Sequence, residues 1–259
     1  MDLYYEVEGK GHPVVLLTGG ADLRNWTFVS PLLAKHFKVI GVDGRGTGES
    51  PTPVEDITLV EDLLSLLDHL ELDKATLIGH SMGGQLATEF ALHYPERVSK
   101  LVLIAPGLSG FSYSQEFEEY TKSIQKAVPD IDKMIEQMLS ASWYRVLNAS
   151  SHRDLMVQIL RHQITRMFEW PAVKMIWPEP PAIDRLEELA AETLLLIGTE
   201  DSPDILRVAD YFQENTDAQI IKIPDVDHMV TLTNPEVLYR HITNFMEDDL
   251  NDAKNIRRE

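Results

Sequence analysis

The sequence predicts an α/β fold in which a mainly parallel sheet carries helices on both faces and a helical cap is inserted. Short apolar runs alternate with amphipathic helical stretches along most of the chain. Residues 107–181 interrupt this alternation with several helical patterns in succession. Within residues 75–93 an apolar run, a glycine-containing turn and a helical stretch follow one another directly. These observations indicate one α/β unit with a helical insertion.

The predicted strands are short, and most are apolar throughout. Residues 3–8 alternate apolar and polar side chains, as a half-buried edge strand does. Mainly apolar runs predict buried strands at 14–17, 39–42, 75–78, 100–104 and 193–198. Residues 218–223, which include Gln219 and Lys222, are expected to form the last strand. Leucines recur at helical spacing between residues 58 and 70, which predicts a helix covering one face of the sheet.

The insertion is expected to form a cap over the carboxyl edge of the sheet. Helical patterns cover residues 115–128, 130–140 and 152–170. We therefore divide the chain into a core of residues 1–106 and 182–259 and a cap of residues 107–181. The polar residues 247–259 are expected to form a helix end and a frayed tail. Ligand pockets are mostly apolar, so the residues expected to line a substrate pocket are Trp26, Phe111, Trp143, Phe168 and Met229. Packing between helices is the alternative role for each aromatic residue.

Composition limits the classes of function. The net charge of −19 argues against a nucleic-acid partner, because phosphate binding requires a basic face. The absence of cysteine excludes disulfides, thiol catalysis and thiolate metal sites. No apolar run approaches transmembrane length, and we expect no signal peptide, because the first residues lack its basic and apolar regions. We expect a cytoplasmic enzyme with a small-molecule substrate, no metal and no cofactor, while the oligomeric state stays open.

Residues 79–83 carry the pattern Gly-x-Ser-x-Gly at the junction of a predicted strand and a predicted helix. This is the context of a nucleophile elbow, a sharp turn that exposes the serine hydroxyl at the carboxyl edge of the sheet. Gly79 and Gly83 leave the room that such a turn needs. The pattern predicts Ser81 as a nucleophile.

A serine of this kind needs a histidine base and an acid that orients it, and both are expected later in the chain. Asp201 follows the predicted strand 193–198, and His228 follows the predicted strand 218–223. Because the carboxyl ends of parallel strands meet at one edge, all three side chains are expected to lie together. Asp204 competes with Asp201 for the role of acid but lies farther from its strand. Asp225 and Asp227 flank His228 and are expected to cap turns.

An oxyanion hole needs two backbone N–H groups near the nucleophile. We assign one to Met82, the residue after Ser81, and the other to Gly20 in the loop after strand 14–17, with Ala21 as the second choice. A glycine turn without this role is the alternative for the loop.

The chain resembles the α/β-hydrolase superfamily from about Leu3 to Phe245. The resemblance depends on the motif at 79–84, on Asp43-Gly-Arg-Gly-Thr-Gly-Glu-Ser50, and on the two loops that carry the acid and the histidine. Residues 180–186 resemble the return from the cap in lipase- and esterase-like members. Thr18 stands where family members commonly have histidine. The resemblance implies an α/β-hydrolase fold and a serine esterase or lactonase with a helical cap.

The predicted function is hydrolysis of a small carboxylic ester or lactone through an acyl-enzyme on Ser81. One alternative is a carbon–carbon bond hydrolase or a lyase-type member acting on an anionic substrate. Basic residues of the cap, which could attract such a substrate or form a solvated helix face, are Arg145, His152, Arg153, Arg161, His162 and Arg166. The menaquinone-synthesis enzyme of the superfamily often has arginine where Gln85 stands here. A second alternative is a ligand-binding receptor without activity.

Overall fold

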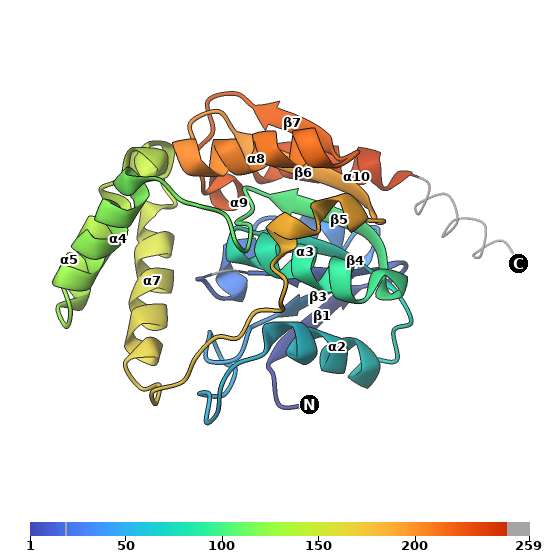
Figure 1. The fold of residues 1–259 in the computed structure, drawn as a ribbon, viewed down its shortest axis with the longest axis horizontal. Coiled ribbons are helices and arrows are strands. Elements are labelled where there is room, and N and C mark those ends of the chain that lie inside the picture. Colours follow the sequence, from blue (N-terminus) through green and yellow to red (C-terminus); the bar gives the residue numbers. More distant parts are fainter. Residues whose placement is uncertain (19, 248–259) are drawn as a thin grey trace, which may run out of the picture.

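The computed structural model describes residues 1–18 and 20–247. A seven-stranded sheet forms its centre, which confirms the predicted α/β fold. The sheet order is β1-β3-β2-β4-β5-β6-β7 (Figure 1). The strands are β1 (Tyr5–Gly9), β2 (Pro13–Leu17), β3 (Lys38–Val42), β4 (Ala75–His80), β5 (Val98–Ile104), β6 (Glu192–Gly198) and β7 (Gln219–Ile223).

The direction of the strands determines where a site can form. β1 lies antiparallel at one edge, and the other neighbouring pairs are parallel. The chain proceeds from β2 to β3 on one side of β2 and then returns to place β4 on its other side. The loops after β2 and β4 therefore leave the sheet in opposite directions. Such a switch point, at the carboxyl ends of parallel strands, is the usual location of a ligand site in an open α/β sheet.

Helices cover both faces of the sheet, which explains why the central strands are apolar throughout. Val14 and Leu16 pack in one hydrophobic cluster, and Val15 and Leu17 pack in another. The first cluster includes residues of α1 (Ser30–Leu33) and α10 (Pro235–Phe245). The second includes residues of α2 (Leu59–His69), α3 (Met82–His93) and α8 (Pro203–Asn215).

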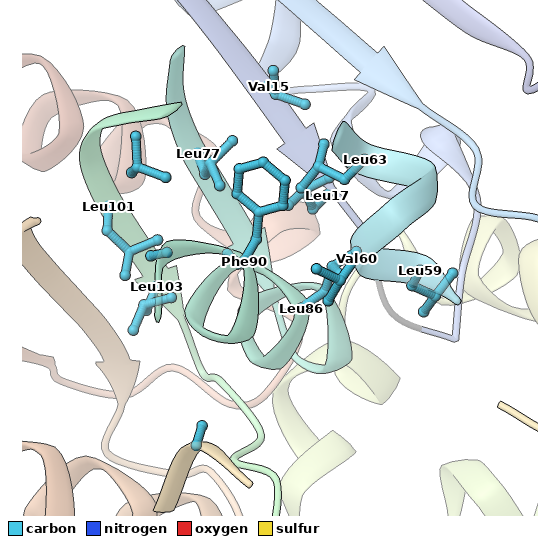
Figure 2. Packing of buried hydrophobic residues seen from close by; sticks show 14 of the residues in the cluster. Val15, Leu17, Leu59, Val60, Leu63, Leu77, Leu86, Phe90, Leu101 and Leu103 are labelled. Carbon is cyan, nitrogen blue, oxygen red and sulfur yellow. The ribbon is translucent and has the colours of Figure 1, made fainter. Parts of the chain in front are cut away.

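The ring of Phe90 on α3 occupies the centre of the second cluster (Figure 2). Leu77 of β4 and Leu63 of α2 lie beside it in the same cluster. Phe90 is fully buried, and burial of such a side chain contributes about 1.5–3 kcal/mol. This packing fixes α3, which begins directly after Ser81, against the sheet.

The segment between β5 and β6 carries the predicted cap helices, which gather at one end of the molecule (Figure 1). They are α4 (Gln115–Lys126), α5 (Ile131–Leu139), α6 (Arg145–Ala149) and α7 (Arg153–Met167), with the 3₁₀ helix η3 (Ser142–Tyr144) before α6. A third hydrophobic cluster joins α5, α6 and α7 to Met229 and Leu232. The division into residues 1–106, 107–181 and 182–259 stays a prediction.

The remaining elements are short. They are η1 (Leu23–Trp26), η2 (Pro95–Arg97), η4 (Ala182–Asp184), η5 (Leu186–Glu188) and α9 (Val230–Thr233). Across residues 1–18 and 20–247, every helix is too short or too polar to cross a membrane. The tail expected within 247–259 lies outside the described residues from 248 onward.

Candidate active site

Ser81 joins β4 to α3 in a strained conformation, with φ +57° and ψ −120°. A positive φ is uncommon outside glycine and is found at functional turns. A Cβ atom on Gly79 would collide with the carbonyl of Gly83, and one on Gly83 would collide with the carbonyl of Leu17. The turn therefore requires both glycines, and it presents Ser81 at the carboxyl edge of the sheet.

Loops after two other strands bring a histidine and an acid to this serine. His228 Nε2 lies 3.1 Å from Ser81 Oγ, and His228 Nδ1 lies 3.0 and 3.1 Å from the two carboxylate oxygens of Asp201. The carboxylate only accepts, so Nδ1 carries the proton and Nε2 is free to accept from the serine hydroxyl. This arrangement can transfer the serine proton to the imidazole.

The competing acid, Asp204, lies in a different environment. Its carboxylate accepts from the backbone N–H of Ser114 at 3.0 Å and from the Ser114 hydroxyl at 2.6 Å. It also pairs with Arg207 at 2.9 Å. Asp204 thus anchors the start of α4, while Asp201 accepts from the histidine.

The two histidines at the site have opposite shifts in pKa. Burial lowers the pKa of His228, but the charge and hydrogen bond of Asp201 outweigh it, so the pKa is raised above 6.5. Burial and the neighbouring His228 lower the pKa of His80 to about 3. His80 is therefore neutral at physiological pH, and His228 is the histidine poised to exchange a proton.

A cavity of about 220 Å³ opens above Ser81. The residues that line it are Gly20, Ala21, Asn25, His80, Ser81, Met82, Met138, Tyr144, Met156, Leu160, His228 and Met229. Both residues assigned to an oxyanion hole, Gly20 and Met82, therefore border the space next to the serine. Gly20 has φ +66°, and nothing lies within 4 Å of where its Cβ would be. The loop leaves open space at this position.

The chain matches the family model described as "alpha/beta hydrolase fold" over residues 12–235. It belongs to the α/β-hydrolase family. The resemblance inferred from the motifs is thereby confirmed, and membership supports hydrolytic activity.

Individual relatives of this α/β-hydrolase differ in chemistry. A 2-hydroxy-6-oxo-2,4-heptadienoate hydrolase of Pseudomonas putida is 30% identical over 208 residues, which cover 74% of the chain and 73% of the relative. The dihydrolipoyllysine-residue acetyltransferase component of an acetoin cleaving system of Pseudomonas putida is 46% identical over 107 residues, 39% of the chain. That match spans only 29% of this longer relative. The structure of a thermophilic esterase from Thermogutta terrifontis aligns with a TM-score of 0.73 and 26% identity, over 95% of this chain and 93% of that one.

Of the five side chains expected to line the pocket of this α/β-hydrolase, all within the described residues, Met229 alone borders the cavity. Trp26 is buried in the cluster beneath α1 and α10. Phe111 lies against the guanidinium of Arg207. The ring of Trp143 stacks on Phe117 and lies edge-on to Tyr120, both of α4, and Phe168 is 47% exposed. The pocket residues were predicted from the size and apolar character of their side chains, which do not determine the direction in which each side chain points.

The basic residues of the cap also lie away from the cavity. Arg161 pairs with Asp132 on the cap surface, and Arg145 pairs with Glu200 at 2.7 Å. Arg166 donates to the carbonyl of Ser50 at 2.6 Å. Arg145, Arg153, Arg161 and Arg166 are all absent from the described residues that line the cavity. They therefore make no direct contact with the space beside Ser81.

Sequence reasoning missed a buried polar chain behind the loop that carries His228. His80 Nε2 donates to the backbone carbonyl of His228 at 2.8 Å, so its Nδ1 accepts from the Asn25 amide at 3.3 Å. Asn25 Oδ1 in turn accepts from the Thr231 hydroxyl at 3.0 Å. All three residues are nearly fully buried. The position of His80 next to Ser81 was the available signal, but its partners come from distant parts of the chain.

Proposed function

We propose that this α/β-hydrolase cleaves a small, uncharged carboxylic ester or lactone through an acyl-enzyme on Ser81. The observation that carries the proposal is the chemistry of the cavity above the serine. Its wall is formed largely by the apolar side chains of Met138, Met156, Leu160 and Met229. Among the described residues of the lining there is no Lys, Arg, Asp or Glu. An ionised group in such a space would lose its hydration without gaining a partner, which is costly.

The reaction follows from the hydrogen bonds at the serine. His228 accepts the proton of the Ser81 hydroxyl as the oxygen attacks the carbonyl carbon of the substrate. Asp201 holds the imidazole in the required tautomer and stabilises the imidazolium that forms. The backbone N–H groups of Gly20 and Met82 donate hydrogen bonds to the negative oxygen of the tetrahedral intermediate.

Collapse of that intermediate breaks the bond to the alcohol oxygen, which receives the proton from His228. The acyl group is then held as an ester on Ser81. His228 next removes a proton from water, whose oxygen attacks the acyl carbon. The bond to Ser81 Oγ then breaks, Oγ receives the proton from His228, and the carboxylic acid is released. A lactone follows the same steps, except that the alcohol remains attached to the acid.

The size of the cavity indicates a short acyl group. Pockets for drug-sized ligands have volumes of roughly 300–1,000 Å³. The cavity of about 220 Å³ lies below that range. Methionine side chains are flexible and fill irregular gaps, so the wall could adjust to different short chains.

Carbon–carbon bond hydrolysis is the second candidate. It is favoured by the heptadienoate hydrolase relative, which is 30% identical over 74% of the chain. The same serine, histidine and acid would serve such a reaction. The apolar cavity wall disfavours carbon–carbon bond hydrolysis of substrates that would place a carboxylate beside Ser81.

Pre-steady-state hydrolysis of p-nitrophenyl esters, from acetate to decanoate, tests the proposal. We expect a burst of one p-nitrophenolate per enzyme, a maximum rate with short acyl chains, and loss of turnover in Ser81→Ala. Ser65→Ala, which removes an exposed hydroxyl on α2, is the matched control and should behave as the wild type. Equal rates in Ser81→Ala and the wild type would exclude Ser81 as the nucleophile. Absence of ester turnover, with cleavage of a vinylogous diketone, would favour the carbon–carbon candidate.

A further inference from the structure

Asp227 is a buried carboxylate for which the proposed mechanism has no role. It directly precedes His228 and is 0% exposed. One carboxylate oxygen accepts from the backbone N–H of Leu147 at 2.8 Å, and the other accepts from the N–H of Met229 at 3.2 Å. The bond to Met229 is the turn cap that the sequence suggests. The bond to Leu147 reaches a residue 80 positions away.

The bond between Asp227 and Leu147 belongs to a junction between the cap and the loop that carries His228. The segment 143–147 contributes the carbonyl of Trp143, which accepts from the backbone N–H of His228 at 3.3 Å. The same segment carries Tyr144, whose ring lies edge-on to the imidazole of His228 with the ring centres 6.1 Å apart. One wall of the cavity and the position of the imidazole are therefore determined by a shared set of bonds.

Backbone pairing alone would not require an ionised side chain at residue 227. Burying a carboxylate is costly, and burial raises the pKa of Asp227, although its backbone hydrogen bonds oppose that shift. The charge of Asp227 also acts on His228, where it adds to the effect of Asp201 in raising the pKa of the imidazole. A buried anion next to the base thus has an electrostatic effect in addition to its structural one.

We propose that Asp227 is a positioning residue of the reaction, which fastens the His228 loop to cap segment 143–147 and stabilises the imidazolium as a second anion. This inference depends on the proposed role of His228 as base. Asp227 acts through His228 and the wall at Tyr144, and it does not touch the reacting atoms.

Other titratable groups face the same imidazole. Asp201 reaches it from the loop after β6, His80 from the end of β4, and Tyr144 from η3. Ser81 shares its Nε2. A test must therefore change the charge at residue 227 while the other four groups remain.

The decisive measurement is an NMR titration of the His228 imidazole in full-length protein labelled at histidine, with His228→Gln used to assign the resonance. We expect Asp227→Asn to lower the titration midpoint of His228. Asp225→Asn is the matched control, because it makes the same change two residues away at an exposed position, and it should leave the midpoint in place. An unchanged midpoint in a folded Asp227→Asn protein would overturn the proposal. Asp227→Ser, which keeps an acceptor for Met229 without the charge, replaces it if the asparagine variant does not fold.

Kinetics separate the inference from the proposed ester hydrolysis. In Asp227→Asn we expect kcat on a short p-nitrophenyl ester to fall by about tenfold to 10²-fold, as small misplacements of catalytic groups do, with KM little changed. The acid limb of kcat/KM should move to lower pH together with the NMR midpoint. If the NMR midpoint moves but neither wild type nor variant cleaves any ester, the proposed ester hydrolysis fails, while the electrostatic effect of Asp227 on His228 stands. A loss of kcat with an unmoved acid limb would contradict the electrostatic role.

Discussion

Strand β4 and helix α4 differ sharply in how deeply they are buried in this α/β-hydrolase. Every residue of β4 is buried, and the strand lies between two parallel neighbours. α4, which is described throughout, has no buried residue and packs mainly on α5. The serine thus follows a rigid strand, whereas the cap is assembled from partly exposed helices. The contrast teaches that the reacting groups depend on the sheet, and the shape of the pocket depends on the cap.

Segment 143–147 is the part of the cap where this contrast is weakest. Leu147 is fully buried, and its backbone N–H donates to the carboxylate of Asp227, which joins the segment to the core. Changes in the core should therefore abolish turnover, and changes in the outer cap should redirect or spare it.

The largest effect is expected at the acid of the core. Asp201→Asn should lower kcat by about 10⁴-fold, because an amide can hold the wrong imidazole tautomer. Asp204→Asn, three residues along in the first turn of α8, is the matched control, and it should lower kcat by less than about tenfold, since its partner is Ser114 rather than the base. Steady-state rates on p-nitrophenyl butyrate measure both. A greater loss in Asp204→Asn would exchange the roles assigned to the two acids.

The pH dependence of the wild type tests the environment of the base. A base works only when it is unprotonated, so kcat/KM should fall as the pH decreases through the raised pKa of His228. Well below the midpoint the loss should approach about tenfold per pH unit. The midpoint should therefore lie above 6.5, the ordinary imidazole value. A midpoint at or below that value would contradict the assigned effect of the two neighbouring carboxylates.

A change in the turn itself should reduce stability. Gly79→Ala places a methyl group against the carbonyl of Gly83, and such overpacking costs about 1–3 kcal/mol. At Gly44 a Cβ would meet its nearest atoms only at 3.8 Å. Gly44→Ala should therefore change the free energy of unfolding by less than about 1 kcal/mol. Urea denaturation of the two variants measures the difference, and equal stabilities would indicate that the turn relaxes.

A change in the cap wall should alter selectivity. Met138→Ala removes an apolar side chain from the cavity wall and should shift the preferred acyl chain to greater length. We expect about a tenfold change in the ratio of kcat/KM for octanoate and acetate esters, the scale at which pockets sense a few methylene groups. Met134→Ala, on the same helix but absent from the described lining, serves as the control. An unaltered chain-length profile would show that α5 does not limit the pocket.

The smallest effect is expected on the outer surface of the cap. The side chain of Arg161 is 48% exposed and pairs with Asp132. Exposed pairs contribute little, so Arg161→Ala should leave rates on neutral and carboxylate-bearing esters within about twofold of the wild type. The ratio of the two rates is the quantity to measure. Selective loss with the carboxylate-bearing ester would revive the role of this residue in attracting an anionic substrate.

The sequence was informative where a residue depends on its neighbours along the chain. Ser81, Asp201 and His228 each follow a predicted strand, and parallel strands bring their carboxyl ends together, so their proximity could be predicted. The strand preceding Ser81 and the helix following it could be recognised from local pattern alone.

Contacts between distant segments could not be predicted in the same way. The cavity residues Met138 and Met156 come from two different cap helices, and no local pattern relates their directions. Trp143 contacts the histidine loop through its backbone carbonyl, although its aromatic ring drew attention to it. The role of Asn25 depends on packing between η1, β4 and α9. Directions of side chains are determined by tertiary packing, which sequence periodicity does not encode.

The parallel pairing of β2 with β4 fixes more than the shape of the sheet. Leu17 lies opposite Gly79 in this ladder, so the loop carrying Gly20 and the turn carrying Ser81 begin from adjacent rungs. Neighbouring strands stand about 4.8 Å apart wherever such a ladder forms. This spacing is set by hydrogen bonds between main-chain atoms, so substitution of side chains changes it little. The spacing between Ser81 and the proposed oxyanion donor Gly20 is therefore anchored in the sheet and does not depend on the cap helices.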